Sequence, residues 1–264
     1  MDAVPIPLMF AGMIGFVLIF LELGYRVGRV VHRRDPGEKE SPVSVISGAI
    51  LGLAAFMLAF SFGIVSNRYD AKKELVRADA NAIRTVWRRA EFLPEPDRTE
   101  SIGLLRGYVD KRLAFSERPD TDPRAVGAAL AGARHVHDRL WAIAVANARK
   151  DMNSDVAALY IESLNEMANI HALRVAVGMQ ARVPLEIWLS LLFLTGLGML
   201  VVGYQTAIAE SKRSVIQPIL AVCFALVIAL IATLDRPGSG VLKVTQQPMA
   251  ELRDAMAASA SAVP

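Results

Sequence analysis

The chain has 264 residues, 53% of them hydrophobic, and a formal net charge of +3 at pH 7. The hydrophobic share exceeds that of an ordinary soluble domain, and the small charge excess gives no reason to expect a nucleic-acid partner. With a single cysteine, Cys223, the sequence also excludes an intrachain disulfide framework.

Four charge-free stretches account for the apolar composition. They cover residues 3–21, 41–67, 187–209 and 214–234. A hydrocarbon core of ~30 Å requires about 20 apolar residues in a helix, and each stretch approaches or exceeds that length. The sequence therefore predicts four transmembrane helices. No stretch alternates polar and apolar residues as a strand would, so the predicted class is all-α.

Residues 1–66 are predicted to form a transmembrane hairpin with helices over about 6–30 and 42–66. The turn is marked by Asp35-Pro36-Gly37, which breaks the first helix. Because Met1-Asp2-Ala3 lacks the basic start of a signal peptide, we interpret the first stretch as a retained span.

The second span is predicted to continue as one helix into water. No proline lies between Pro42 and Pro94, and the apolar run passes without a break signal into the charged segment 68–74. At ~1.5 Å per residue such a helix would be roughly 75 Å long, which exceeds the ~30 Å hydrocarbon core. A helix that begins in lipid and ends in water is the central feature predicted for this chain.

Residues 67–183 are predicted to form a helical extramembrane bundle inserted between the second and third spans. Helix-start signals stand at Asp97, Asp122 and Asn153-Ser154-Asp155. Apolar residues recur at helical spacing after each of them, which indicates amphipathic helices that can bury a common core.

The rest of the chain is predicted to return to the membrane. Residues 184–236 form a second transmembrane hairpin with spans over about 184–208 and 214–235. Residues 237–264 are predicted to be a C-terminal tail, frayed in its Ala/Ser-rich end after Met256.

Small residues recur along one face of the second span. They are Gly48, Gly52, Ala55, Ala59 and Gly63. Small residues let transmembrane backbones approach closely, so the row predicts a helix-packing seam. In a second interpretation the helix packs through this row while Phe56 and Phe60, on a different face, narrow a pore.

A basic stripe follows on the same predicted helix. It consists of Arg77, Asn81, Arg84 and Arg88, at steps of four, three and four. The stripe is either a funnel that attracts anions or a face that pairs with acids of the bundle, such as Asp155, Glu162 and Glu166, or is simply solvated.

Helix ends gather charge at one predicted membrane surface. The charged residues there are Arg68, Asp70, Arg182, Glu186, Asp235 and Arg236. Asp235 ends a helix, where the dipole disfavours an anion, so we expect Arg68 or Arg182 as its partner. Such a cluster either anchors the helix ends or takes part in ion gating.

Near the end of the first span, Glu22 is either a functional carboxylate or the partner of Arg26.

The sequence holds no motif that predicts catalysis, a metal site or a cofactor. His135 and His137 lie two residues apart on a predicted helix and therefore point apart, which argues against a zinc pair. Phosphate-binding loops, HExxH and GxSxG are absent from the sequence, and no basic residue lies near Cys223 to activate its thiol. We therefore expect no enzyme activity, no metal and no cofactor.

Seven short segments, spread over nearly the whole chain, form a recognisable sequence pattern. They are Leu58-Ala59-Phe60-Ser61-Phe62, Arg68-Tyr69-Asp70, Asn81-Ala82-Ile83, Leu93-Pro94, Pro184-Leu185-Glu186-Ile187-Trp188, Gly203-Tyr204 and Leu234-Asp235-Arg236-Pro237-x-x-Gly240. This set resembles the bacterial bestrophin-like domain family of four-span membrane proteins. The Asp-Arg-Pro ending is its most distinctive part.

That family in turn resembles the true bestrophins, pentameric ion channels in which the second membrane helix lines the pore. The resemblance implies a homo-oligomeric channel, with a pentamer as its expected form, in the bacterial inner membrane. It implies the lipid bilayer, further copies of this chain and inorganic ions as partners. The expected constriction is Phe56, Phe60 or Phe62, with Arg68 and Asp70 at the mouth.

This chain lacks features of the true bestrophins, and the sequence also allows a second function. Where bestrophins carry Trp-Trp-Glu after the Tyr-Asp pair, this chain has Ala71-Lys72-Lys73-Glu74, and it has no acidic calcium-binding run, so calcium gating is not expected. The alternative function is a non-conducting membrane scaffold or sensor whose bundle binds a partner. Only the channel requires an axial oligomer with the second span at its centre.

The orientation in the membrane receives two conflicting predictions. The short loops 31–41 and 209–214 are rich in lysine and arginine, and the positive-inside rule places such loops in the cytoplasm. By parity the bundle would then lie outside. The resemblance to bestrophins implies instead a cytoplasmic bundle.

Overall fold

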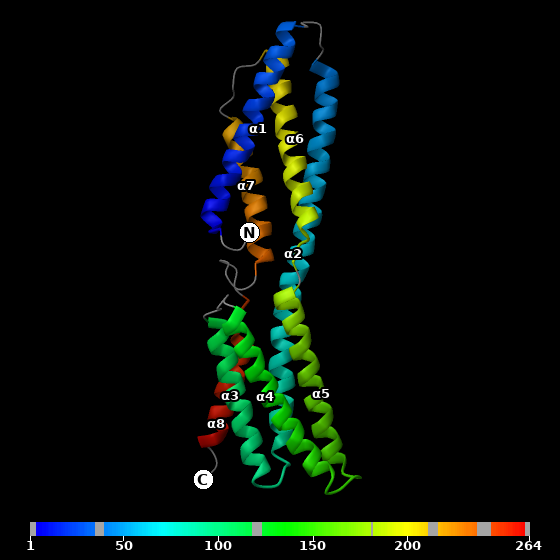
Figure 1. Ribbon diagram of the computed structural model, residues 1–264, viewed down its shortest axis with the longest axis vertical. Helices are drawn as coiled ribbons and strands as arrows, with labels where there is room; N and C mark the ends of the chain where they lie inside the picture. Colours follow the sequence, from blue (N-terminus) through cyan, green and yellow to red (C-terminus); the bar gives the residue numbers. More distant parts are fainter. Residues whose placement is uncertain are drawn as a thin grey trace. The chain divides into compact units, whose positions relative to one another are not determined.

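The computed structural model describes residues 4–34, 40–117, 123–180, 182–210, 216–236 and 244–261. Throughout these residues the regular secondary structure is helical, as predicted (Figure 1). The chain divides into two compact units. The membrane unit comprises residues 1–68 and 182–242, and the helical unit comprises residues 69–181 and 243–264. The cationic loop residues Lys39, Lys212 and Arg213, and Pro237 and Gly240 of the family pattern, lie outside the described residues.

Four described helices are long and apolar enough to cross a membrane, as predicted. They are α1 (Ile6–Arg34), α2 (Glu40–Ala90), α6 (Leu185–Ile208) and α7 (Ile216–Asp235). α1 packs beside α6 and α7 (Figure 1). The predicted uninterrupted second helix is confirmed, since α2 is one α-helix of 51 residues.

Glycines bring the backbones of α1 and α6 into direct contact. A Cβ atom at Gly24 would lie 1.8 Å from the Leu200 carbonyl oxygen, and one at Gly203 would lie 2.1 Å from the Leu21 carbonyl oxygen. Both distances are far below van der Waals contact, so only glycine fits at these positions. Lipid supplies no hydrophobic force between helices, and such close backbone packing replaces it.

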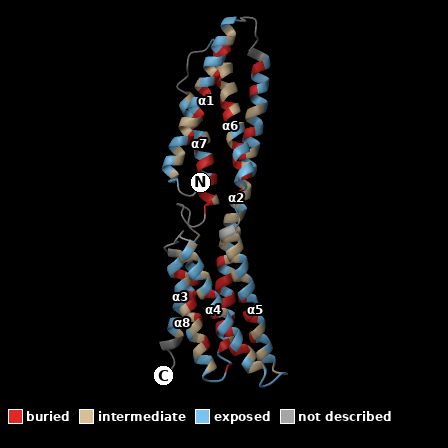
Figure 2. Cartoon of the chain, in the orientation of Figure 1, coloured by how far each residue is buried: buried red, intermediate tan, exposed pale blue. Residues whose placement is uncertain are grey.

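Among the described residues, the small-residue row of α2 is not used in this way. A Cβ atom at Gly48, Gly52 or Gly63 would meet no atom within 4 Å. α2 turns a different side toward its own unit, with Ala54 buried and Leu51 reaching to 3.1 Å from a Cβ at Gly198. The row stays a prediction for contacts outside this chain. Figure 2 shows exposed residues along much of α2.

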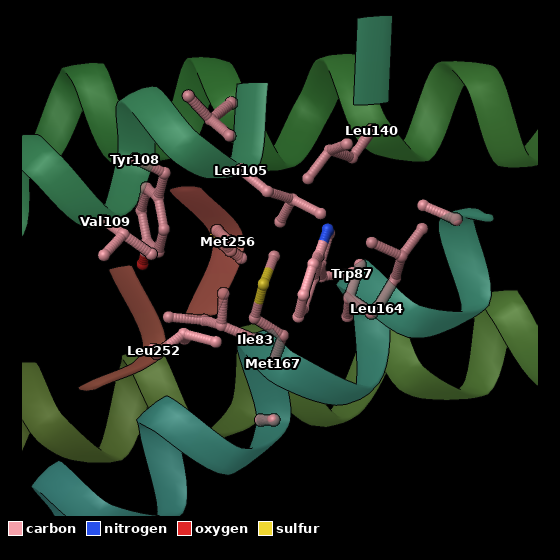
Figure 3. Packing of buried hydrophobic residues seen from close by; sticks show 14 of the residues in the cluster. Ile83, Trp87, Leu105, Tyr108, Val109, Leu140, Leu164, Met167, Leu252 and Met256 are labelled. Carbon is pink, nitrogen blue, oxygen red and sulfur yellow. The ribbon is translucent and has the colours of Figure 1, made fainter. Parts of the chain in front are cut away.

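The helical unit packs amphipathic helices around large apolar side chains. With the second part of α2, it contains α3 (Asp97–Glu117), α4 (Pro123–Ala148), α5 (Asp155–Val175), the short π-helix η1 (Ala176–Gln180) and α8 (Gln247–Ser261). Ser154 caps α5 by accepting a hydrogen bond from the Ala157 N–H at 3.2 Å. Fully buried Ile83, Leu105, Leu140 and Met167 meet at the centre (Figure 3).

The C-terminal segment differs from the predicted frayed tail. α8 continues to Ser261 and buries Met249, Leu252 and Met256 in the core of the helical unit. The Arg106 guanidinium donates to the Met256 carbonyl oxygen at 2.9 Å. These three apolar residues stand three and four apart on one face of a helix. The stripe ends where the Ala/Ser-rich part of the segment begins.

Candidate functional site

The exposed side of α2 in the membrane unit carries large aromatic side chains. Phe56 is 64% exposed and Phe60 54% exposed, and their rings stack with centroids 6.4 Å apart. Phe62 is 38% exposed, but it lies two residues beyond Phe60 and therefore on another side of the helix. The described residues leave more than half of each of these two side chains uncovered, so lipid, a second copy or a conduction path meets them.

In the membrane unit one ion pair joins the middle of α2 to the C-terminal end of α7. An Arg68 Nη1 lies 3.5 Å from Oδ1 of Asp235, and the same carboxylate oxygen accepts a hydrogen bond from the Val183 N–H at 2.9 Å. Both contacts compensate a carboxylate at the C-terminus of α7, where the helix dipole is unfavourable to it. Asp235 thus fastens the end of α7 to α2 and to the segment that leads into α6.

Two other residues expected in this cluster have printed contacts with groups other than Asp235. Asp70 pairs with Lys73 at 3.7 Å, one turn along α2. Arg236 is buried and its Nη2 lies 3.9 Å from the Met9 sulfur. Arg182 and Glu186 are exposed, and Glu186 stands in the first turn of α6, where the helix dipole favours a carboxylate. On α1, Glu22 accepts a hydrogen bond from Arg26 at 2.7 Å.

The basic stripe presents its polar groups to solvent in the single chain. Arg77, Asn81 and Arg84 are exposed, and the two arginines make no ion pair with a described residue. Arg88 lies 3.4 Å from Glu91 and covers the ring of Trp87.

Among the described residues, none of the three acids expected as partners of the stripe pairs with it. Glu162 lies 3.5 Å from Arg89, which is not part of the stripe. Glu166 and Asp155 are exposed and take part in no ion pair among the residues that the structure describes.

A buried charge cluster occupies one end of the core in the helical unit. Asp79 is fully buried, and its Oδ2 accepts hydrogen bonds from Arg112 at 2.6 Å and from Arg174. The Oδ1 atom has no hydrogen-bond partner in the described chain. Arg174 also donates to the Gln246 side-chain oxygen at 2.8 Å, next to α8. One carboxylate therefore joins α2, α3, α5 and the C-terminal segment.

Two neutral histidines adjoin this cluster. Arg112 Nη1 lies 2.8 Å from His171 Nδ1, and because an arginine only donates, that nitrogen carries no proton. Burial lowers the pKa of His171 to about 4, with Arg112 as the next cause, and burial also lowers the pKa of His137. The Tyr108 hydroxyl lies between them, 3.2 Å from His171 and 3.3 Å from His137, and burial raises the pKa of Tyr108 to about 12.

One known protein family accounts for most of the chain. The bestrophin-like domain model matches residues 14–249. The chain belongs to the bestrophin-like family. No curated protein sequence matches this bestrophin-like protein significantly.

Solved structures share the fold of this bestrophin-like protein. A point mutant of a bacterial bestrophin homolog from Klebsiella pneumoniae is 16% identical, with 95% of this chain and 97% of that chain covered and a TM-score of 0.59. A membrane protein with a single glycine-to-alanine substitution gives 17% identity, coverage of 96% and 99%, and a TM-score of 0.64. At these identities the likeness shows a common fold.

Sequence reasoning missed the Asp79 cluster in this bestrophin-like protein. No short motif surrounds Asp79, and its two arginines come from helices far along the chain. A signal was nevertheless present, since Asp79 falls on the same helix face as the buried Val76, Ile83 and Val86. A carboxylate within an apolar stripe must be paired, because an unpaired buried charge is very costly. Among the described residues no group of three possible ligands could hold a metal ion.

Proposed function

We propose that this bestrophin-like membrane protein is an ion channel built from several copies of the chain around α2. Family membership supports an ion channel, and the exposed side of α2 supports α2 as the lining helix. The observation that carries the proposal is the small-residue row, because no described residue comes within 4 Å of a Cβ at Gly48, Gly52 or Gly63. Glycines in a membrane helix favour close contact with another helix. A neighbouring copy provides that helix.

In this arrangement two neighbouring sides of α2 make different contacts, one with the next copy and one with the conduction path. The small-residue row faces the next copy, while the stacked rings of Phe56 and Phe60 face the conduction path and narrow it. Phe62 lies on another side of the helix and faces away from the path. The Arg68–Asp235 pair anchors α2 where the apolar part of the helix ends.

The proposal is tested by planar-bilayer recording of purified protein. We expect a measurable conductance that rises in Phe60→Ala and Phe56→Ala, because removing a ring widens a constriction. Phe193→Ala is the matched control, since Phe193 is 67% exposed in the same unit but lies on α6. It should leave the conductance unchanged, and Phe62→Ala should change it less than Phe60→Ala does.

A silent bilayer would decide against the channel. If the wild-type protein forms an oligomer and yet carries no current, and Phe60→Ala carries none either, the scaffold or sensor function replaces the channel. Particle symmetry gives the complementary result, because a conduction path along α2 requires a closed ring with α2 nearest the axis.

A further inference from the structure

The exposed sides of α2 and α5 in the helical unit carry complementary polar residues at matching spacing. On α2 the exposed residues Asn81, Arg84 and Arg88 stand at steps of three and four. On α5 the exposed residues Asn169, Glu166 and Glu162 stand at the same steps in the reverse direction. Two basic groups and an amide thus have two acidic groups and an amide as counterparts on an antiparallel helix.

The contacts inside one chain define which residues of the two helices lie level. Arg174 binds Asp79, and Glu162 lies 3.5 Å from Arg89, so α5 runs antiparallel to α2. Arg84 is midway between Asp79 and Arg89 on α2. Glu166 lies within two residues, about 3 Å, of the corresponding midpoint on α5. The side chains of arginine and glutamate easily span such an offset.

The two polar faces do not meet within one chain. α5 contacts α2 on the side of Arg89, five residues beyond Arg84 and therefore about 140° around the helix. Arg84 makes no ion pair with a described residue, and neither does Glu166. The stripe and α5 therefore border the exposed side of α2 at opposite edges. Each chain presents a basic face at one edge and an acidic face at the other.

We infer that the α2 stripe of each copy binds the acidic face of α5 in the next copy around the ring, with Arg84 against Glu166 and Arg88 against Glu162. This inference rests on the proposed assembly around α2. Rotation about an axis along the helices leaves residues at their level, so the register within one chain carries over to the neighbouring copy. Two of the three acids expected from the sequence to neutralise the stripe, Glu162 and Glu166, do so between copies.

Charges already paired at the surface do not prevent this contact. The Arg88–Glu91 and Arg89–Glu162 pairs are exposed on at least one side, and exposed pairs contribute only about 0–1 kcal/mol. They can rearrange when a second copy arrives. Electrostatic complementarity of this kind fixes the register and suppresses wrong partners more than it adds affinity.

Cysteine cross-linking between different copies tests the register. In a Cys223→Ala background, chains with Arg84→Cys are co-expressed with chains carrying Glu166→Cys and treated with a short bifunctional thiol reagent. We expect linked dimers in the mixture and none from either chain alone. The matched control replaces Glu166→Cys by Asp155→Cys, which is exposed on the same helix but about 16 Å away along it.

Equal linking with Asp155→Cys, or none with Glu166→Cys, would overturn the interface.

A charge reversal gives the second measurement. Arg84→Glu and Glu166→Arg should each raise the protein concentration needed for assembly on the order of tenfold, and the double variant should restore it. Failure of the two proposals is distinguishable: a linked ring without conductance refutes only the channel, whereas a conducting oligomer without the link refutes only the interface.

Discussion

The membrane unit and the helical unit pack their helices in different ways, one through glycine backbone contacts and the other through large apolar side chains. In the membrane unit α1 and α6 meet through Gly24 and Gly203, backbone against backbone. In the helical unit the helices surround large side chains such as Trp87 and Met167. Water drives large apolar side chains together, whereas in lipid they gain nothing by leaving their surroundings, so close backbone contact has to hold the helices.

Charge is also handled differently in the two units. In the membrane unit the paired carboxylates keep some exposure, 34% for the Glu22 side chain beside Arg26 and 11% for the Asp235 side chain beside Arg68. The helical unit buries the full charge of Asp79 and surrounds it with two arginines and two neutral histidines. Stability of the membrane unit should therefore respond to steric changes, and stability of the helical unit to changes in charge and pH.

The largest expected effect comes from filling the glycine contact. Gly24→Leu places a side chain where even a Cβ would lie 1.8 Å from a carbonyl oxygen, so we expect a loss well beyond the about 1–3 kcal/mol typical of overpacking. Thermal unfolding in detergent measures it. Gly12→Leu, on the same helix, is the matched control, because no described atom lies within 4 Å of a Cβ at Gly12. Similar losses in both variants would contradict the contrast between the two glycines.

A smaller effect is expected from removing the buried carboxylate. Asp79→Ala leaves Arg112 and Arg174, which are 17% and 19% exposed, without their buried partner, and breaking a buried pair costs about 3–5 kcal/mol. Chemical unfolding followed by the fluorescence of Trp87 and Trp141, both in the helical unit, measures the loss. The control is Asp70→Ala, whose exposed pair with Lys73 should contribute less than about 1 kcal/mol. Equal losses of unfolding free energy in the two variants would show that the buried Asp79 pairs stabilise the unit no more than an exposed pair does.

The smallest expected effect is a pH dependence confined to the helical unit. The folded pKa of His171 is about 4, below its usual value of 6.5, so the unfolded chain binds more protons between these two values. The stabilising contribution is complete above about pH 6.5 and declines as the pH falls toward 4. His137 acts in the same direction.

The groups around His171 set the sign of this pH effect. Arg112 and Arg174 oppose protonation of the ring, and so would a charged His137, whereas Asp79 favours it. Asp138 favours protonation of His137 alone. His171→Gln should flatten the fall in Tm between pH 7 and pH 5, while exposed His135→Gln should leave it unchanged. An unaltered slope in His171→Gln would assign the pH dependence to other groups.

Much of the fold was readable from sequence because long apolar runs have few structural solutions. The four charge-free stretches predicted four spans, and the absence of proline after Pro42 predicted the unbroken α2. Helix-start signals predicted the beginning of α5 at Ser154. The C-terminal helix was missed, because three apolar residues in a short segment form a helix stripe only when a core is available to receive them.

The candidate site was less predictable because its parts come from distant segments. The exposed Phe56 and Phe60 could be placed on one side of a helix from their spacing alone. The sequence could not show whether the small-residue row packs against another helix of the same chain, since that depends on which side α2 turns toward α6. The Asp79 cluster combines side chains almost one hundred residues apart in sequence, as Asp79 and Arg174 show.

The sequence by itself determined the membrane spans, the all-helical class and the bestrophin-like family of this protein. Each of these depends on residue type and spacing along one segment. Only the tertiary structure decided that glycines of α1 and α6, rather than those of α2, form the close contact within the chain, and that Asp79 is buried between two arginines. Such choices depend on which helix sides meet, and that is set by the summed packing of the whole chain.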